Sequence, residues 1–296
     1  MRSKIYLYRL AQWLNSRLPS RAAGWLAEQL ADFQWRGSSL DRAAVRFNLT
    51  LVLGSPIEER SPLVREVFRN FARYLVEFLS AHRLREPSVA LEGDEHLAQT
   101  FRANRGSIIL SAHIGNWELG AMVFHRLGVP ISIVVLPHQD PRVNQFFDHQ
   151  RLRCGVDVVP LNGQATQRCL ELLREGRSLG ILGDREFGHH GVAVSFFGRQ
   201  ATVPRGPAIL SLRTHAPVVP VFLIREGLWR FRLYIEPPIW PPERPYTEAT
   251  VLALTQTYVT VIERYIRRFP SQWLMFQPLL GEPIRESANC ELPIAD

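Results

Sequence analysis

A histidine and a glutamate stand where an apolar run gives way to a helical pattern. Residues 107–124 (SIILSAHIGNWELGAMVF) begin as a buried strand would and end with apolar residues at helical spacing. His113 and Glu118 are five positions apart, and five helical steps of about 100° would point them in different directions. They can meet if His113 lies in the turn and Glu118 in the first helical turn. Gly115 and Asn116 supply the backbone freedom that this turn needs.

A histidine that a carboxylate orients at the C-terminal end of a strand can act as a general base. The carboxylate fixes the tautomer and stabilises the imidazolium that forms. In parallel sheets this edge is also where ligands bind. The alternative is a buried histidine beside a helix start, with Glu118 favoured by the helix dipole. The residues alone leave both interpretations open.

Other catalytic and metal-binding patterns are weak or missing in the sequence. It contains no G-x-S-x-G motif, no Gly-rich phosphate loop and no paired cysteines, since Cys154, Cys169 and Cys290 are scattered. The stretch GHHG at 188–191 has adjacent histidines without a third ligand. We therefore expect no metal and no cofactor, and a base that acts directly on a substrate hydroxyl.

The elements around this turn predict an α/β fold. Helical spacing extends to about residue 84, and short apolar runs then alternate with helices of 10–14 residues. We expect a single domain with a central, mostly parallel sheet flanked by helices, divided into a helical N-terminal region (1–84) and an α/β core (85–296). The predicted strands are 107–112, 131–136, 156–160, 179–183, 192–196, 217–224 and 229–236, the last two as an antiparallel hairpin. The predicted core helices are 114–127, 142–153, 164–175 and 247–268.

The charge balance favours an anionic partner. The 296 residues carry 35 Lys and Arg against 28 Asp and Glu, and nearly all of the cations are arginines. Such a chain suits a nucleic acid, an anionic membrane surface or an acidic carrier, although a basic proteome would give the same balance. The cations are dispersed and form no nucleic-acid-binding pattern, so we expect no nucleic acid.

The first 20 residues predict an amphipathic helix that mixes arginines with aromatic residues. Arg9 interrupts the apolar segment and no small-residue cleavage site follows, so neither a signal peptide nor a transmembrane helix is expected. One interpretation places this helix in a membrane interface, with Ile5, Tyr8, Trp13 and Leu14 as its apolar residues. The other packs it on its own domain.

Several segments together resemble bacterial glycolipid acyltransferases, namely the late acyltransferases of lipid A synthesis and the phosphatidylinositol mannoside acyltransferases. HIGNWELG resembles the H-x4-[DE] motif of that family. Further segments are similar to family segments in the same order along the chain: RAAVRFNL (42–49), EGDEHL (92–97), GILGDREFGHHGVAVSFFGRQATVPRGPAIL (180–210), APVVPVF (216–222) and QWLMF (272–276). The chain lacks the long apolar N-terminal anchor of many lipid A enzymes, so we expect peripheral attachment at the cytoplasmic face of the membrane.

The resemblance implies an O-acyltransferase that moves a fatty acyl chain from acyl-carrier protein or acyl-CoA to a hydroxyl of a membrane lipid. His113 would be the base and Glu118 its partner. The residues expected to contact substrate are Asn116, Asp184, Arg185, Glu186, Gly198, Thr202 and Arg205. The turn at 197–206 would supply N–H groups to the oxyanion. Arg185 would bind phosphate or sugar, or else form a structural ion pair. The alternatives are a thioesterase-like hydrolase and a non-catalytic lipid-binding module.

Overall fold

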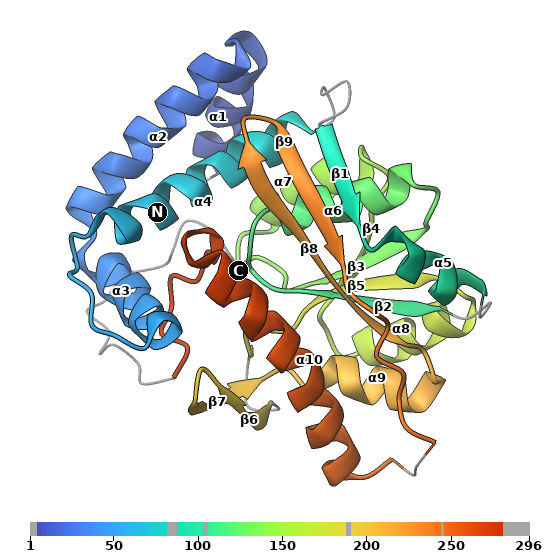
Figure 1. The fold of residues 1–296 in the computed structure, drawn as a ribbon. Coiled ribbons are helices and arrows are strands. Elements are labelled where there is room, and N and C mark those ends of the chain that lie inside the picture. The colour runs from blue at the N-terminus through green and yellow to red at the C-terminus, as the bar shows by residue number, and fades with distance from the viewer. Residues whose placement is uncertain (1–4, 82–87, 103–105, 188–190, 244–245, 281–296) are drawn as a thin grey trace.

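The computed structural model describes residues 5–81, 88–102, 106–187, 191–243 and 246–280. Seven of the described strands form one sheet in the order β1-β9-β8-β2-β5-β3-β4, with β9 antiparallel to β8 and all the other neighbours parallel. This confirms the predicted α/β class (Figure 1). The strands are β1 (Ser88–Glu92), β2 (Ser107–Ser111), β3 (Ile131–Val135), β4 (Asp157–Pro160), β5 (Ser178–Leu182), β8 (Val218–Gly227) and β9 (Arg230–Ile235).

Helices cover both faces of the sheet, because its central strands are apolar on both sides. In β2, Ile108 and Leu110 pack on one face, whereas Ile109 packs on the other. The first face carries α8 (Ala165–Arg174), α9 (Gly206–Thr214) and α10 (Glu248–Arg268); the second carries α5 (Asp94–Arg102), α6 (Trp117–Arg126) and α7 (Pro141–Leu152). The central strands are therefore buried, and their ends can position reactive groups rigidly.

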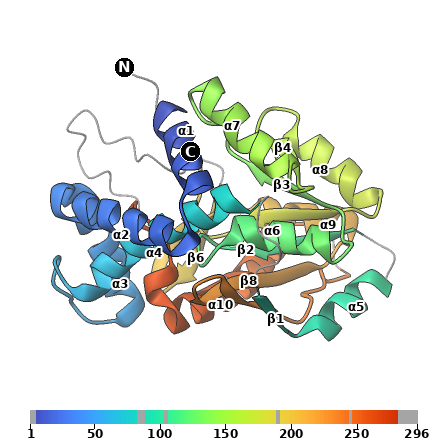
Figure 2. The same ribbon diagram turned by 90° about the horizontal axis from the view of Figure 1, so that it is seen from above.

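The N-terminal helices pack beside one end of the sheet (Figures 1 and 2). They are α1 (Ile5–Arg17), α2 (Ser20–Gly37), α3 (Ser39–Leu53) and α4 (Pro62–Ser80). Val64, Val67, Phe68 and Phe71 of α4 form a separate apolar core with α2, α3 and Leu274. The C-terminal half of α4 joins the core of the sheet through Phe78 and Leu79. Helix α4 thus links the helical region to the α/β core.

Several element predictions need correction. The strand predicted at 192–196 is β6 (Val192–Phe196), but it pairs only with β7 (Arg199–Val203) in a hairpin outside the main sheet. The sequence analysis did not predict β1, β7 or α5, which contribute few buried residues and therefore show little periodic signal. The antiparallel β8–β9 hairpin is confirmed, and it carries a bulge between Arg225 and Gly227.

Helix α1 combines the two interpretations given for it. Ile5 and Tyr8, expected to face a membrane, are buried in the protein, and the ring of Tyr8 lies 5.1 Å edge-on from Phe147. The opposite side of α1 and much of α2 present exposed apolar residues to solvent: Tyr6, Leu7, Leu10, Trp13, Trp25, Leu30 and Phe33. Within the described residues, no helix is long and apolar enough to cross a membrane.

Candidate active site

Two adjacent parallel strands bring a histidine and an aspartate together. Strands β2 and β5 pair in register, with Ser111 opposite Leu182. His113 and Asp184 each follow two residues later, so both leave the same edge of the sheet at the same level. The side chains of paired residues in parallel strands point the same way, and the contact between these two side chains therefore follows from the register.

Asp184 holds His113 through both its ring and its backbone. The ring Nδ1 lies 2.8 Å from Oδ1 of Asp184, and the backbone N–H of His113 donates to Oδ2 at 3.0 Å. The indole N–H of Trp273 also donates to Oδ2, at 2.9 Å. Burial alone would raise the pKa of the Asp184 carboxyl, but the charge and hydrogen bonds of His113, with the bond from Trp273, lower it overall. The carboxylate is thus ionised, and it can keep the proton of a neutral imidazole on Nδ1 and leave Nε2 as the base.

Glu118 does not form the predicted contact with His113. Its two carboxylate oxygens accept hydrogen bonds from Arg151 of α7, at 2.6 Å from Nη2 and 3.2 Å from Nε. Both side chains are buried, and a buried carboxylate strongly favours a bidentate guanidinium partner. Burial alone would lower the pKa of Arg151, but the charge and hydrogen bonds of Glu118 raise it overall. The carboxylate on the histidine is Asp184, which the sequence analysis had placed among the residues expected to contact substrate.

Asn116 is a structural cap and has no surface for substrate. Its side-chain oxygen accepts from the backbone N–H of Leu119 at 3.1 Å, which caps α6 at its N-terminus. Its amide group donates to Oε2 of Glu77 at 2.8 Å. Both Asn116 and Asp184 are fully buried. The structure thus gives both side chains buried protein partners, and their contact with substrate stays a prediction.

A cavity of about 680 Å³ opens beside His113. Arg185, Glu186 and Arg205 line it, as do Glu118 and Arg151. The guanidinium of Arg185 lies 4.5 Å from the centre of the Phe187 ring, and Arg205 forms an ion pair with Glu248 at 2.6 Å. Most of the remaining wall is apolar, including Ile109, Phe124, Ile131, Cys169, Leu210 and Val221. A largely apolar lining with a few charged side chains suits a ligand with a polar head and a hydrocarbon chain.

The β6–β7 hairpin does not supply the expected oxyanion donors. Gly198 lies in its tip and lines a separate shallow surface pocket against α10, and Thr202 is exposed on β7. The backbone N–H of Phe197 donates to Glu263 at 2.8 Å and is therefore occupied. Of the stretch 197–206, only its end at the start of α9 reaches the cavity, through Pro204, Arg205 and Gly206.

The described residues contain no cluster of three His, Cys, Asp or Glu side chains that could hold a metal ion. His189 and His190, of the GHHG stretch, lie outside the described residues.

Two site residues had no role in the sequence analysis. Trp273 is buried, and its segment closes over the histidine turn, because the N–H of Leu274 donates to the carbonyl of His113 at 2.7 Å. The QWLMF similarity marked this segment without giving it a contact. Arg151 lies in a helix whose spacing alone does not distinguish it from the surface arginines nearby.

A family model and several known proteins match this chain over most of its length. Residues 2–281 match the family model described as bacterial lipid A biosynthesis acyltransferase. A phosphatidylinositol mannoside acyltransferase of Mycobacterium tuberculosis is 28% identical over 92% of this chain and 90% of its own length. One from Mycolicibacterium smegmatis is 29% identical over 79% and 78%. A lipid A biosynthesis palmitoleoyltransferase of Escherichia coli is 24% identical over 93% and 90%.

Proposed function

Because this chain belongs to the bacterial lipid A biosynthesis acyltransferase family, we propose that it moves a fatty acyl chain from an acyl thioester to a hydroxyl of a membrane glycolipid or phospholipid. The thioester is carried by acyl-carrier protein or by coenzyme A, and no further cofactor takes part. The observation that carries the proposal is the His113–Asp184 pair, whose histidine lines a largely apolar cavity.

The reaction needs one base and no covalent enzyme intermediate. Nε2 of His113 removes the proton from the acceptor hydroxyl while the oxygen of that hydroxyl attacks the carbonyl carbon of the thioester. The tetrahedral intermediate collapses, the carbon–sulfur bond breaks, and the imidazolium returns its proton to the departing thiolate. Asp184 stabilises the imidazolium between these two steps. The net change is one ester formed and one thioester broken.

The charged residues that line the cavity would bind the polar parts of the substrates. Arg185 offers a planar fork that suits a phosphate on the acceptor or on the donor's carrier arm. Glu118 acts through Arg151 by holding the guanidinium against the cavity wall. The acyl chain would then occupy the apolar interior, away from water.

The exposed apolar side of α1 and α2 would attach the enzyme peripherally at the cytoplasmic face of the membrane. Trp13, Trp25 and Phe33 are all more than half exposed, with arginines at positions 9, 17, 21 and 36 in the same two helices. Aromatic residues mixed with arginines favour the interface of an anionic bilayer. This placement would bring the cavity within reach of a lipid headgroup.

The direct test is His113→Ala, assayed with palmitoyl-CoA and an under-acylated lipid A or a phosphatidylinositol mannoside. Removing a positioned base should lower transfer by about 10²–10⁴-fold. Thioester cleavage by the wild type should depend on the added acceptor. Cleavage at the same rate without acceptor would indicate a hydrolase. A variant that kept more than about a tenth of the wild-type rate would contradict His113 as the base.

A further inference from the structure

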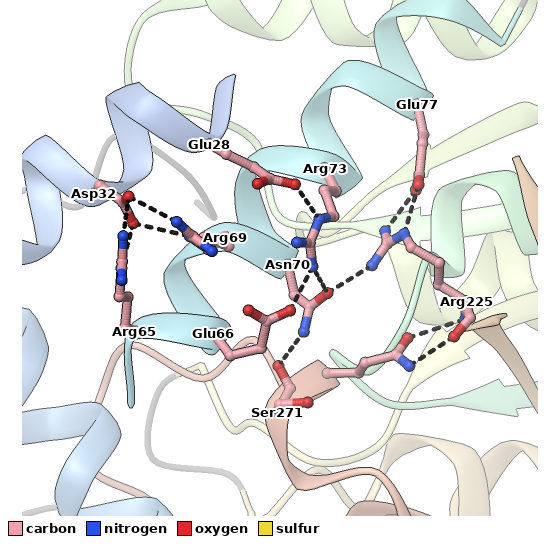
Figure 3. A network of polar contacts seen from close by, with 11 residues as sticks. Glu28, Asp32, Arg65, Glu66, Arg69, Asn70, Arg73, Glu77, Arg225 and Ser271 are labelled. Carbon is pink, nitrogen blue, oxygen red and sulfur yellow. Dashed lines mark hydrogen bonds and ion pairs between the residues drawn. The ribbon is translucent and has the colours of Figure 1, made fainter. Parts of the chain in front are cut away.

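A connected set of polar contacts runs from the N-terminal helices to the turn that carries His113. Figure 3 shows this set beside a separate cluster, in which Arg65 and Arg69 of α4 bind Asp32 of α2 and lower the pKa of that carboxyl. Arg73 of α4 binds Glu28 of α2 at 2.8 Å. Arg73 also donates to Asn70 at 3.0 Å, and it so joins Glu28 of α2 to the inner part of the set.

The inner part is centred on a buried ion pair between α4 and β8. Glu77 accepts from Nε of Arg225 at 2.5 Å and from Nη2 at 2.6 Å (Figure 3). The third nitrogen of the guanidinium donates to Asn70 at 3.0 Å. The side chains of Glu77 and Arg225 are each only 7% exposed. A buried charge pair of this kind is weak evidence for added stability, because desolvation offsets much of the attraction.

Glu77 has one further partner, and that partner belongs to the catalytic turn. Its Oε2 accepts the amide N–H of Asn116 at 2.8 Å, while the oxygen of the same amide caps α6. Asn116 stands three residues after His113. The orientation of its amide is fixed by its partners, because Leu119 presents a donor and Glu77 presents an acceptor. Glu77 thus holds the junction between the histidine turn and α6.

The turn itself has little freedom to adjust. Gly115 has φ of +64°, and a Cβ at this position would collide with the carbonyl of Leu223. The N–H of Asn116 donates to that same carbonyl at 2.9 Å, and the N–H of Gly115 donates to Gln272 at 2.9 Å. The side chain of Gln272 is in turn bound to both backbone groups of Arg225. Arg225 therefore reaches the turn by two routes, through Glu77 and through Gln272.

We propose that Glu77, held by Arg225, is a positioning residue for acyl transfer: by binding the Asn116 amide, it sets the turn that places His113 against Asp184 and the cavity. The inference rests on the proposed function of His113. Glu77 and Arg225 are not among the residues that line the cavity, so they act through Asn116 and contact no substrate.

The test is Asn116→Asp, measured as kcat across a range of pH with palmitoyl-CoA and an under-acylated lipid A or a phosphatidylinositol mannoside. Aspartate keeps the cap on α6 but replaces the N–H donor to Glu77 with a second carboxylate. At alkaline pH the two carboxylates repel each other, and loss of a hydrogen bond to a charged group predicts a fall in kcat of about ten- to a hundredfold. As the pH falls, the pair shares one proton and regains a hydrogen bond, since opposed carboxylates raise one another's pKa. The ratio of variant to wild-type kcat should therefore rise on acidification.

Two further variants separate positioning from general damage. Asn70→Asp adds a carboxylate beside the same guanidinium, but it faces the neutral Ser271 carbonyl at 2.9 Å and no second acid, so its ratio to wild type should rise much less as the pH falls. Glu77→Gln combined with Asn116→Asp restores a donor and an acceptor, and should recover part of the loss and remove the pH dependence. If Asn116→Asp gives no folded protein by circular dichroism, Glu77→Gln replaces it. That variant should lower kcat with little change in the KM for palmitoyl-CoA, and an unchanged kcat would overturn the inference.

If Asn116→Asp is folded and its kcat relative to wild type does not change with pH, the positioning role is overturned, provided that His113→Ala is inactive in the same assay. If His113→Ala remained active, the proposed function itself would fall.

Discussion

Replacing Asp184 with asparagine should leave the fold intact but put the proton on the wrong nitrogen of His113. Oδ2 of Asp184 accepts two N–H donors, the backbone of His113 and the indole of Trp273. An asparagine at this position must keep its side-chain oxygen toward these two donors. If its NH₂ group faced them instead, that group, the backbone N–H of His113 and the indole N–H of Trp273 would all lack an acceptor. The NH₂ group then faces Nδ1 of the imidazole, which must become the acceptor. The ring proton moves to Nε2, where the base has to be unprotonated.

The expected loss can be worked from the role of the base. A positioned general base contributes about 10²–10⁴-fold, and the equivalent tautomer error in the serine protease triad lowers kcat about 10⁴-fold. We therefore expect kcat for Asp184→Asn to fall about 10²–10⁴-fold, which corresponds to about 3–5 kcal/mol of transition-state stabilisation. Trp273→Phe is the matched control. It removes only one of the two donors to Oδ2, so the tautomer is retained and the loss should be much smaller.

Two measurements check this reasoning. Acceptor-dependent release of coenzyme A gives kcat, and ¹⁵N chemical shifts of His113 report which ring nitrogen carries the proton. Since the folded-state pKa of Asp184 is lowered, its ionisation stabilises the native state above about pH 4, and this stability is lost as the pH falls through the lower folded value. The difference in the free energy of unfolding between wild type and Asp184→Asn should therefore become smaller only at acidic pH. A variant that kept more than a tenth of wild-type kcat, or one whose proton stayed on Nδ1, would refute the tautomer argument.

The remaining predictions concern the cavity and the membrane. Arg185→Lys should raise the acceptor KM nearly as much as Arg185→Ala, because lysine keeps the charge and loses the planar fork; wild-type kinetics for the lysine variant would argue against this contact. Cys169→Phe fills part of the apolar wall and should shift preference toward shorter acyl-CoA donors in a chain-length series, whereas an unchanged preference would place the chain elsewhere. Trp13→Ser combined with Phe33→Ser should reduce sedimentation with anionic vesicles while leaving the melting temperature nearly unchanged, since both side chains are exposed.

The sequence was sufficient for the fold because the central strands are unambiguous. Residues 107–111 and 218–224 are nearly continuous apolar runs, and such runs indicate strands covered on both faces. The strand predicted at 192–196 lies outside the main sheet, because a strand pattern indicates burial but not the partner strand. Strand β1 was missed because only Val89 of its five residues is even partly buried, so its alternation is faint.

The predicted contact between His113 and Glu118 is wrong, because each side chain has another partner. His113 was identified from its position at a strand end, but the pairing with Glu118 assumed that closeness in the chain means contact. The actual partner is 71 residues away and follows from the alignment of β2 with β5, which single-sequence reasoning does not provide. Glu118 pairs instead with Arg151, which is 33 residues away in the next helix along the chain. Long-range ion pairs of this kind leave no periodic trace in the sequence.

The Trp273 segment has a consequence for how the enzyme is made. The site is assembled from three separate stretches of the chain, at His113, at Asp184 and at residues 272–274. The last of them follows the histidine by about 160 positions. A growing chain on the ribosome therefore cannot complete the site until almost all of the described sequence has been synthesised. Helices α1 and α2, which we propose to be the membrane-binding surface, are synthesised first, so on that proposal the chain could meet the bilayer before it is able to react there.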